Sequence, residues 1–319
     1  MQDSPTVDTT PRVFVVIPTH NRWRETEISL GRLFESTYPN FQIVLVEDGC
    51  TDDTVEQCKA KFPAVEILHG DGNLWWSGAI NLGTQHALDH DAEMVMWIND
   101  DVRVEPATMS ELVNTIQRTG PRSVACARIK AVDESAPEWR GAPPPWHPAF
   151  TTYQDQDEAS LPQDIPINHP PGGQGVMIPA SCFKEIGIID IKNFPHYWAD
   201  HDFHYRAMEA GFQYYVAREA VVWNVPNKTR PASTDEFSLR GVRWFLFHRR
   251  SPMNMPTLRR LLKRHLPPAE YRRIFYPILF RHLTWLSYGW LRGKPRLHGP
   301  LRAVKKTVSG PASDRASGR

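Results

Sequence analysis

Five short apolar runs that are rich in β-branched residues alternate with segments of helical periodicity, and this alternation constrains the fold more than any other feature of the chain. The runs cover residues 13–17, 41–46, 65–68, 94–98 and 123–129. Because apolar residues dominate these runs without a helical period, each is expected to form a strand that is buried on both faces. Strand and helix repeated in this order predict an α/β fold with a doubly wound, mostly parallel sheet.

The segments between the runs predict the helices that cover this sheet. Apolar side chains recur at helical spacing in three places: Trp23, Leu30, Leu33 and Phe34, then Val55, Cys58 and Phe62, then Ile80, Gly83 and Ala87. A fourth helix is expected to carry Pro106 in its first turn and to end at Gly120. Further along, we expect a long irregular loop rich in proline, two helices and two strands, at residues 137–171, 181–186, 202–210, 212–216 and 220–223.

Polar and mostly acidic residues follow the first four strand-like runs. In doubly wound sheets, ligands bind beyond the carboxyl ends of the strands, which lie along one edge. Polar loops would give a similar composition without any function. The position of all four segments after strands nevertheless favours a binding site built from residues 18–21, 47–49, 69–73 and 99–101.

Asp100 and Asp101 stand side by side after the fourth run. Two adjacent carboxylates cannot both ionise cheaply without a cation, and oxygen ligands suit Mg²⁺ or Mn²⁺. The alternative is a solvated turn in which one Asp caps the helix expected near Pro106. No P-loop and no GxGxxG motif accompanies the pair, which argues against ATPases and dehydrogenases.

A second acidic cluster lies between His196 and Arg206 and contains Asp200 and Asp202. One of these carboxylates could take a proton from a hydroxyl nucleophile if it faces the acidic pair. Alternatively, either could cap the following helix, while Arg206 pairs with a carboxylate one turn earlier. A His/Asp metal centre of a hydrolase lacks a second HxH or HD pair to complete its ligands.

Taken together and in order, six segments resemble the family 2 glycosyltransferases of GT-A fold, and within them the bacterial rhamnosyltransferase-like branch. The segments are VFVVIPTHNR at 13–22, VEDGCTDDT at 46–54, GNLWWSGAINLG at 72–83, WINDDV at 97–102, GGQGVMIP at 172–179 and YWADHDFHYRAMEAGF at 197–212.

The resemblance implies a Rossmann-like GT-A domain that binds a nucleotide-sugar and a divalent cation. Asp48 would contact the nucleotide base, and Thr19 would lie beside the nucleoside. Asp101 would be the direct metal ligand. The implied donor-binding residues are Pro18, Thr19, Asn21, Arg22, Glu47, Asp48, Gly49, Asn73, Trp76, Asn81 and Asp100, and the acceptor-side residues are Gly173, Gln174, Trp198 and His201.

The same resemblance assigns the chemistry. Asp200 matches the usual catalytic base of the family, and Asp202 would be the second catalytic carboxylate. The cation, Mn²⁺ or Mg²⁺, would neutralise charge on the departing diphosphate, while Asp200 deprotonates an acceptor hydroxyl. Direct displacement would invert the anomeric centre.

Two positions depart from the family pattern. Ala199 precedes the base where relatives often have Glu, and Asn224 stands where many relatives have a metal-binding His. Asn224 could coordinate through its amide oxygen or not at all. Trp76 could stack on substrate or pack beneath the loop.

Charge divides the chain into two unlike parts. Residues 1–239 carry 18 basic and 34 acidic side chains, whereas residues 240–319 carry 19 basic and 2 acidic ones. We expect an N-terminus without order at 1–11, a catalytic domain at 12–239 with a nucleotide-binding half at 12–130 and an acceptor half at 131–239, a basic amphipathic helical extension at 240–306, and a disordered tail at 307–319.

The basic extension interleaves arginines with aromatic residues, a composition typical of helices on anionic membrane surfaces. Packing on the catalytic domain is the alternative, and nucleic acid is a less favoured partner. With no secretory signal or spanning segment in the sequence, we expect a cytoplasmic protein, peripheral on the inner face of the cytoplasmic membrane.

The expected function is an inverting, metal-dependent glycosyltransferase of bacterial surface polysaccharide biosynthesis. Its donor would be a nucleotide-sugar, dTDP-rhamnose or a UDP-sugar, and its acceptor a saccharide or lipid-linked saccharide. Two alternatives belong to other classes: a catalytically inactive, glycosyltransferase-like membrane scaffold, and a nucleic-acid-binding protein that uses the basic tail.

Overall fold

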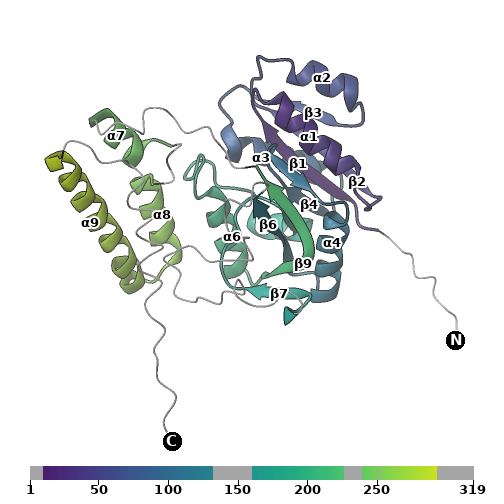
Figure 1. The fold of residues 1–319 in the computed structure, drawn as a ribbon. Coiled ribbons are helices and arrows are strands. Elements are labelled where there is room, and N and C mark those ends of the chain that lie inside the picture. Colours follow the sequence, from purple (N-terminus) through teal and green to yellow (C-terminus); the bar gives the residue numbers. More distant parts are fainter. Residues whose placement is uncertain (1–9, 132–159, 226–238, 250, 252, 293–319) are drawn as a thin grey trace, which may run out of the picture. The chain divides into compact units, whose positions relative to one another are not determined.

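Figure 1 shows the computed structural model of the chain. It describes residues 10–131, 160–225, 239–249, 251 and 253–292. The chain divides into two compact units, Met1–Pro226 and Asn227–Arg319, so the division falls before the boundary at residue 239 that the sequence predicts. Each unit is described by itself.

The first unit is built on one mixed sheet. Along this sheet the strands follow the order β3-β2-β1-β4-β8-β6-β9-β5, and β7 pairs with β9. β3, β2, β1 and β4 form a parallel block, and β8 runs antiparallel between β4 and β6. The described strands are β1 (Val13–Thr19), β2 (Phe41–Glu47), β3 (Glu66–His69), β4 (Met94–Trp97), β5 (Val102–Val104), β6 (Ser123–Ala131), β7 (Asp164–Ile167), β8 (Val176–Pro179) and β9 (Gln213–Asn224).

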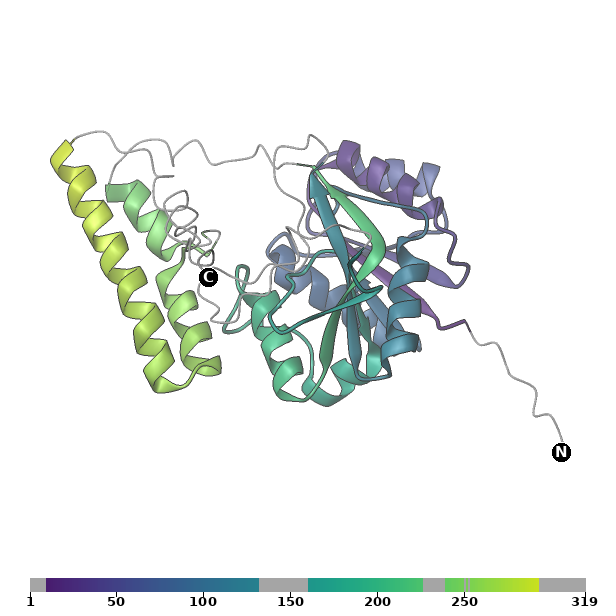
Figure 2. The same ribbon diagram turned by 60° about the horizontal axis from the view of Figure 1, so that its bottom comes forward.

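Helices cover both faces of this sheet (Figure 2). The described helices of the first unit are α1 (Trp23–Phe34), α2 (Thr54–Lys61), α3 (Trp75–Asp89), α4 (Thr108–Thr119), α5 (Ala180–Ile186) and α6 (Ala199–Glu209). The predicted α/β class and the mostly parallel, doubly wound sheet are confirmed.

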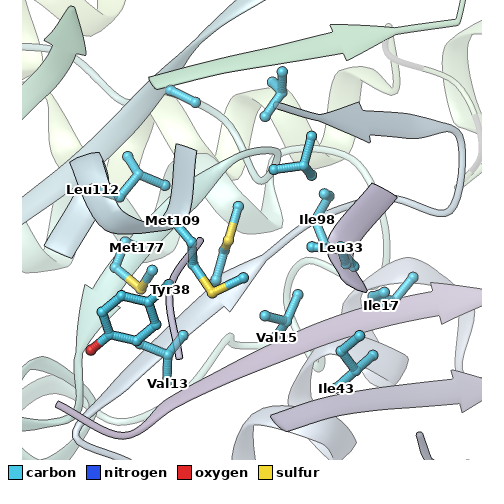
Figure 3. Close-up of a cluster of buried hydrophobic side chains, with 14 of the residues drawn as sticks. Val13, Val15, Ile17, Leu33, Tyr38, Ile43, Ile98, Met109, Leu112 and Met177 are labelled. Atoms are coloured by element: carbon cyan, nitrogen blue, oxygen red, sulfur yellow. The ribbon is translucent and has the colours of Figure 1, made fainter. Parts of the chain in front are cut away.

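Alternate residues of β1 face the two layers of the core. Val15 and Ile17 belong to a buried cluster that includes Leu33 of α1 and Leu112 of α4 (Figure 3). On the opposite face, a Cβ added to Gly83 of α3 would lie 2.4 Å from a methyl carbon of Val16. Only a glycine therefore lets α3 approach the sheet this closely.

Trp97, at the end of β4, anchors the second layer. Its fully buried ring lies 5.8 Å from the ring of Phe183 in α5 and 4.9 Å from that of Phe203 in α6, between centroids. Its indole N–H donates to the Thr84 hydroxyl of α3 (3.0 Å). These contacts fix three helices beside the strand end that carries the acidic pair.

Several sequence predictions differ from the structure in detail. Pro106 lies two residues before α4 instead of in its first turn, and α6 begins at Ala199, three residues early. The two strands expected after residue 211 form one continuous strand, β9. Ordered backbone begins by Thr10, whose carbonyl accepts from Asn40 (2.7 Å), so residues 10 and 11 correct the expectation of disorder for 1–11.

The proline-rich stretch is not irregular throughout. Its C-terminal part contains β7, in which Pro166 pairs with Tyr215 of β9. β7 pairs only with β9 in the described sheet, and an edge strand tolerates the missing N–H of proline. The expected N-terminal part of that loop, before residue 160, lies outside the described residues.

The second unit is helical. Its described helices are α7 (Leu239–Phe247), α8 (Met255–His265) and α9 (Pro268–Arg292). α8 buries Leu258, Leu261 and Leu262 and exposes its basic residues, as expected of an amphipathic helix. In the part of the chain that the structure describes, no helix is long and apolar enough to cross a membrane. The tail expected at 307–319 lies outside the described residues.

Candidate functional site

The loops after β1, β2 and β3 are joined at one edge of the sheet. The backbone N–H of Asp48 donates to the Thr19 carbonyl (3.0 Å), and that of Gly70 donates to the Glu47 carbonyl (2.7 Å). From this edge, the Thr19 hydroxyl donates to Oδ2 of Asp100 (3.1 Å), which follows β4. The structure therefore brings together the strand ends that the sequence predicts as a site.

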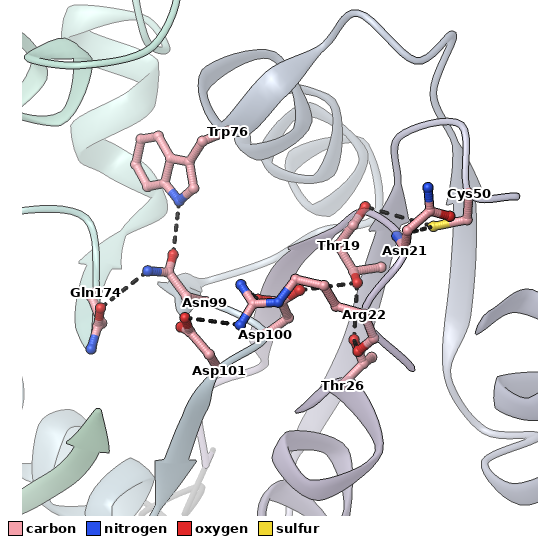
Figure 4. A network of polar contacts seen from close by, with 10 residues as sticks. All are labelled: Thr19, Asn21, Arg22, Thr26, Cys50, Trp76, Asn99, Asp100, Asp101 and Gln174. Atoms are coloured by element: carbon pink, nitrogen blue, oxygen red, sulfur yellow. Dashed lines mark hydrogen bonds and ion pairs between the residues drawn. The ribbon is translucent and has the colours of Figure 1, made fainter. Parts of the chain in front are cut away.

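The acidic pair is buried and faces Arg22 (Figure 4). Nη1 of Arg22 lies 3.1 Å from Oδ1 of Asp100, and Nη2 lies 3.2 Å from Oδ2 of Asp101. Each carboxylate side chain is only 8% exposed, whereas that of Arg22 is 33% exposed. In this arrangement, one guanidinium provides positive charge to both carboxylates.

Burial and charge act in opposite directions on these groups. Burial raises the pKa of Asp100 to about 7, an effect that Arg22 opposes and that the neighbouring Asp101 reinforces. Burial also lowers the pKa of Arg22, but Asp100 and Asp101 outweigh it and raise that pKa above its ordinary value. Positive charge at this position is thus strongly favoured, as expected where two carboxylates leave water together.

Asp48 shapes the loop that starts α3. Its Oδ1 accepts the backbone N–H groups of Gly72 (2.8 Å) and Leu74 (3.1 Å), and its Oδ2 accepts that of Trp75 (2.8 Å). Both carboxylate oxygens are thereby used within the protein. A base contact of the kind implied for Asp48 would have to use the remaining lone pairs.

Glu47 and Asn21 hold the neighbouring turn. Glu47 accepts from the backbone N–H of Cys50 and lies 2.6 Å from Nδ1 of His69, and it is buried. Asn21, in a left-handed conformation (φ 52°), accepts the backbone N–H of Thr51 (2.6 Å). Of the other predicted donor residues, Pro18 lies in β1 opposite Val46 of β2, and Gly49 (φ 69°) and Asn73 lie in the loops after β2 and β3.

Trp76, Asn99 and Gln174 form a hydrogen-bonded chain across the site (Figure 4). The indole N–H of Trp76 donates to Oδ1 of Asn99 (2.9 Å), and Nδ2 of Asn99 donates to Oε1 of Gln174 (3.1 Å). Because indole can only donate, it fixes the orientation of both amides. Asn99 belongs to the predicted site segment 99–101, but no individual role was predicted for it.

Gly173 is close both to Trp76 and to the predicted base, Asp200. A Cβ at residue 173 would lie 2.3 Å from the ring of Trp76 and 3.4 Å from Cβ of Asp200. Trp76 therefore packs against the 172–175 loop, the alternative to substrate stacking that the sequence left open. The same packing places Asp200 beside the loop that reaches the acidic pair through Asn99.

His201 holds the Asp200 carboxylate in place. Oδ1 of Asp200 accepts the backbone N–H of His201 (2.8 Å) and lies 2.9 Å from its Nδ1, and the Asp200 side chain is 22% exposed. Burial raises the pKa of Asp200, but His201 and His204 outweigh it and lower that pKa to about 2. Trp198, in a left-handed conformation (φ 72°), precedes α6 and contacts the His201 ring edge-on.

Asp202 is placed differently from Asp200, which corrects its predicted catalytic role. Its side chain is 0% exposed, and its Oδ2 accepts from Nε of Arg206 (3.0 Å), one turn later in α6. Arg206 also donates to the carbonyls of Ile186 and Ile188. Asp202 is therefore part of a buried ion pair that ties α6 to the segment after α5.

Asn81 is also a correction, because its amide is used inside the protein. Nδ2 of Asn81 donates to the Ile189 carbonyl (2.8 Å), and Oδ1 accepts the Ile189 N–H (3.0 Å). Asn81 is 8% exposed. These two hydrogen bonds to the backbone of Ile189 show that the buried Asn81 amide ties α3 to residue 189, a structural role that the sequence did not predict.

The residues present suit a divalent cation. Asp100 and Asp101 offer carboxylate oxygens, and Mg²⁺ or Mn²⁺ in such sites takes one or two carboxylates together with substrate phosphates and water. Asn224 lies opposite Val102 in the β5–β9 pairing, and Val225 N–H donates to the Asp101 carbonyl, so Asn224 is a neighbour of the pair. Within the described residues, no three His, Cys, Asp or Glu side chains gather into a metal-binding group.

Comparison with known proteins gives the site its family context. The model of glycosyl transferase family 2 matches residues 14–172. Over 141 residues, 28% are identical to the uncharacterized glycosyltransferase YibD of Escherichia coli strain K12, covering 43% of this chain and 40% of that protein. Over 121 residues, 25% are identical to an undecaprenyl-phosphate mannosyltransferase of Micrococcus luteus, covering 37% of this chain and 49% of that protein.

The chain spans less than half the length of these curated relatives. Among solved structures, it resembles the mannosyltransferase PcManGT of Pyrobaculum calidifontis in complex with GDP-Man and Mn²⁺. The TM-score is 0.54 with 16% sequence identity, and the match covers 94% of this chain and 81% of that one. At this identity the likeness shows a shared fold.

Proposed function

Since residues 14–172 place the chain in glycosyl transferase family 2, with a GT-A fold, we propose that it transfers a sugar from a nucleotide-sugar to an acceptor hydroxyl with inversion. The observation that carries the proposal is the position of Asp200. It is an ionised, partly exposed carboxylate beside Gly173, the glycine against which Trp76 packs, and Trp76 is hydrogen-bonded to Asn99, the residue before the acidic pair.

The proposed chemistry divides between two groups of residues. When bound at Asp100 and Asp101, a divalent cation, Mn²⁺ or Mg²⁺, would supply positive charge for the departing diphosphate. Asp200 would accept the hydrogen bond of the acceptor hydroxyl and take its proton as the hydroxyl attacks. His201 keeps the Asp200 carboxylate ionised and oriented through Oδ1. The 172–175 loop would line the acceptor side.

The low pKa of Asp200 limits the timing of proton transfer. A carboxylate with a pKa of about 2 does not deprotonate a free hydroxyl in advance. The hydroxyl becomes acidic only as its oxygen bonds to the anomeric carbon, so proton transfer would accompany bond formation. Attack opposite to the leaving diphosphate would invert that carbon.

The donor is proposed from the resemblance of the sequence to the rhamnosyltransferase-like branch. PcManGT was solved with GDP-Man and Mn²⁺. For this chain, dTDP-rhamnose and UDP-sugars are the proposed donors, and a saccharide or lipid-linked saccharide of a bacterial surface polymer is the proposed acceptor. A thermal-shift screen of nucleotide-sugars with and without Mn²⁺ separates these donors, since a ligand that binds only the folded state raises its melting temperature.

Replacing Asp200 by Asn tests the assignment of the base. The amide keeps the shape of the side chain but cannot take a proton, so we expect transfer to fall by at least about 100-fold. Donor affinity, measured by calorimetry, should stay within about threefold of wild type. An Asp200→Asn enzyme that transfers sugar at the wild-type rate would refute the role of Asp200.

The second unit carries the surface proposed for membrane contact. The three most exposed large apolar side chains of the described residues are Phe247, Tyr276 and Phe280, at 59%, 53% and 68% exposure. Arg272 and Arg273 are exposed one turn before Tyr276. Such a surface suits anionic lipid, and we propose a peripheral position on the membrane.

The two alternative functions predict different measurements. An inactive scaffold would bind vesicles but would neither transfer sugar nor hydrolyse any donor in the presence of Mn²⁺. A nucleic-acid-binding protein would bind duplex or single strands with a steep dependence on salt and would ignore anionic vesicles.

A further inference from the structure

Arg22 occupies the place where the acidic pair needs a cation. Its two terminal nitrogens contact both carboxylates, at 3.1 Å for Asp100 and 3.2 Å for Asp101. The carboxylates are fixed, because Thr19 holds the other oxygen of Asp100 and both side chains are buried. Arg22 is the member with room to turn towards solvent, since a third of its side chain is exposed.

A divalent cation and this guanidinium need the same oxygens. Oδ1 of Asp100 and Oδ2 of Asp101 both face Arg22 (Figure 4). A cation that bound these oxygens with Arg22 in place would bring like charges within a few ångströms in a poorly hydrated site, which is strongly unfavourable. Either the cation or the guanidinium can hold the pair, but both cannot hold it through the same atoms.

We propose that Arg22 is an exchangeable counter-ion of the Asp100–Asp101 pair, which a divalent cation displaces and whose guanidinium then binds the diphosphate of the donor. The proposal rests on the metal-assisted donor site of the proposed function. Arginine is suited to this exchange because its planar fork binds carboxylate and phosphate in the same two-pronged way.

The exchange couples the cation to the nucleotide. Without a diphosphate, displaced Arg22 loses two ion pairs and gains only water, so the cation binds weakly to the free protein. With a diphosphate, the guanidinium has a new partner, and each ligand strengthens the other by the same factor. In the free protein, Arg22 compensates the charge of the two buried carboxylates.

Titration of the full chain with Mn²⁺ alone, followed by the EPR signal of free Mn²⁺, tests the exchange. Arg22→Gln removes the competitor, so we expect it to bind Mn²⁺ about tenfold more tightly than wild type, and Arg22→Lys, which retains charge with one ammonium, to gain less. Arg24→Gln is the matched control, since Arg24 is exposed in the first turn of α1, and its Mn²⁺ affinity should be unchanged.

A second arm repeats the titration with saturating UDP, GDP or dTDP. The nucleotide that binds the protein should strengthen Mn²⁺ binding more in wild type than in Arg22→Gln. Only wild type has a guanidinium that can leave the carboxylates and bind the diphosphate. Thermal unfolding provides an independent readout: Arg22→Gln should melt below wild type without metal and regain most of that difference in Mn²⁺.

Three results would count against the exchange. If Arg22→Gln and Arg22→Lys both bind Mn²⁺ no more tightly than wild type, while Asp101→Asn abolishes binding, the exchange is wrong and the metal site of the proposed function stands. The exchange is equally wrong if the nucleotide strengthens Mn²⁺ binding by the same factor in wild type and Arg22→Gln. If no variant binds Mn²⁺ and nucleotide binds without it, both the exchange and the metal site are wrong.

Discussion

His204 shows how a single buried side chain supports the loop beside Asp200. Its Nε2 lies 2.9 Å from the Gly172 carbonyl, and its Nδ1 lies 2.9 Å from the Tyr214 hydroxyl. A carbonyl can only accept, so Nε2 carries the proton and Nδ1 accepts from Tyr214. The neutral ring thus satisfies both neighbours, whereas a second proton on Nδ1 would make the Tyr214 hydroxyl accept instead of donate and would place a positive charge in a buried position.

Stability should therefore depend on the protonation of His204. Burial lowers the pKa of His204 from 6.5 to about 4, although Asp200 opposes this shift. Because the unfolded chain takes up the proton more readily, the stabilisation is complete above about pH 6.5 and is lost as the pH falls towards 4, by up to about 3 kcal/mol. Urea unfolding at pH 7 and pH 5 measures this loss.

The variant His204→Gln separates this effect from other titrations. It should be less stable than wild type at pH 7, but its free energy of unfolding should change less between pH 7 and pH 5. His90→Gln, at an exposed histidine, should keep the wild-type slope. An unchanged slope in His204→Gln would show that other groups cause the acid sensitivity.

The site residues also show how far a sequence can specify chemistry. The acidic pair and Asp200 could be located because strand ends and motif spacing are local features. For Asp202 the sequence predicted a catalytic role and left an ion pair with Arg206 as the alternative, because both roles are compatible with the same spacing along a helix. Burial decides between them, and burial depends on the packing of α6 against residues distant in sequence.

At the scale of elements, α3 and the 172–175 loop pack tightly against each other, through Trp76 and Gly173. Replacing Gly173 by Ala would place a methyl group 2.3 Å from the ring of Trp76, which must then move. We expect a loss of about 1–3 kcal/mol of stability from overpacking. Transfer activity should fall as well, even where the variant is fully folded, because moving the indole breaks the hydrogen bond to Asn99.

Gly31→Ala provides the matched control for this substitution. Gly31 lies inside α1, and a Cβ there would meet no atom within 4 Å. Alanine is favoured over glycine inside a helix, so this variant should be neutral or more stable by up to about 1 kcal/mol. Melting temperature and initial transfer rate distinguish the two. Equal behaviour of both variants would mean that the loop adjusts freely.

The elements differ in how well the sequence predicted them. Buried strands such as β1 and β2 were predicted to within two residues, because short apolar runs between turn residues usually form buried strands. β5 was missed because its three residues follow the acidic pair without a separate run of their own. β7 was missed because Pro166 argues against a strand unless the strand lies at an edge, and only the observed pairing with β9 reveals that edge.

For the whole molecule, the contrast in charge follows the division into two units. Described and exposed side chains of the second unit include Arg259, Arg260, Lys263, Arg272 and Arg273, and its described residues contain one acidic side chain, Glu270. The first unit has an excess of acidic residues. An anionic membrane should therefore attract the second unit and repel much of the first, so the charges favour membrane contact through the second unit.

The full chain should therefore bind vesicles that contain phosphatidylglycerol and ignore vesicles of phosphatidylcholine alone. Replacing Tyr276 and Phe280 together by Ser should reduce co-sedimentation by at least about tenfold, because these aromatic rings are the apolar part of the contact. Ile191→Ser, at a 46% exposed residue of the first unit, should bind like wild type.

Raising the salt to about 1 M should release the protein, since charges are then screened beyond about 3 Å. Equal binding to both kinds of vesicle would refute the proposed membrane-binding surface, and so would wild-type binding by the double variant. The aromatic residues would then have a role only in packing within the protein.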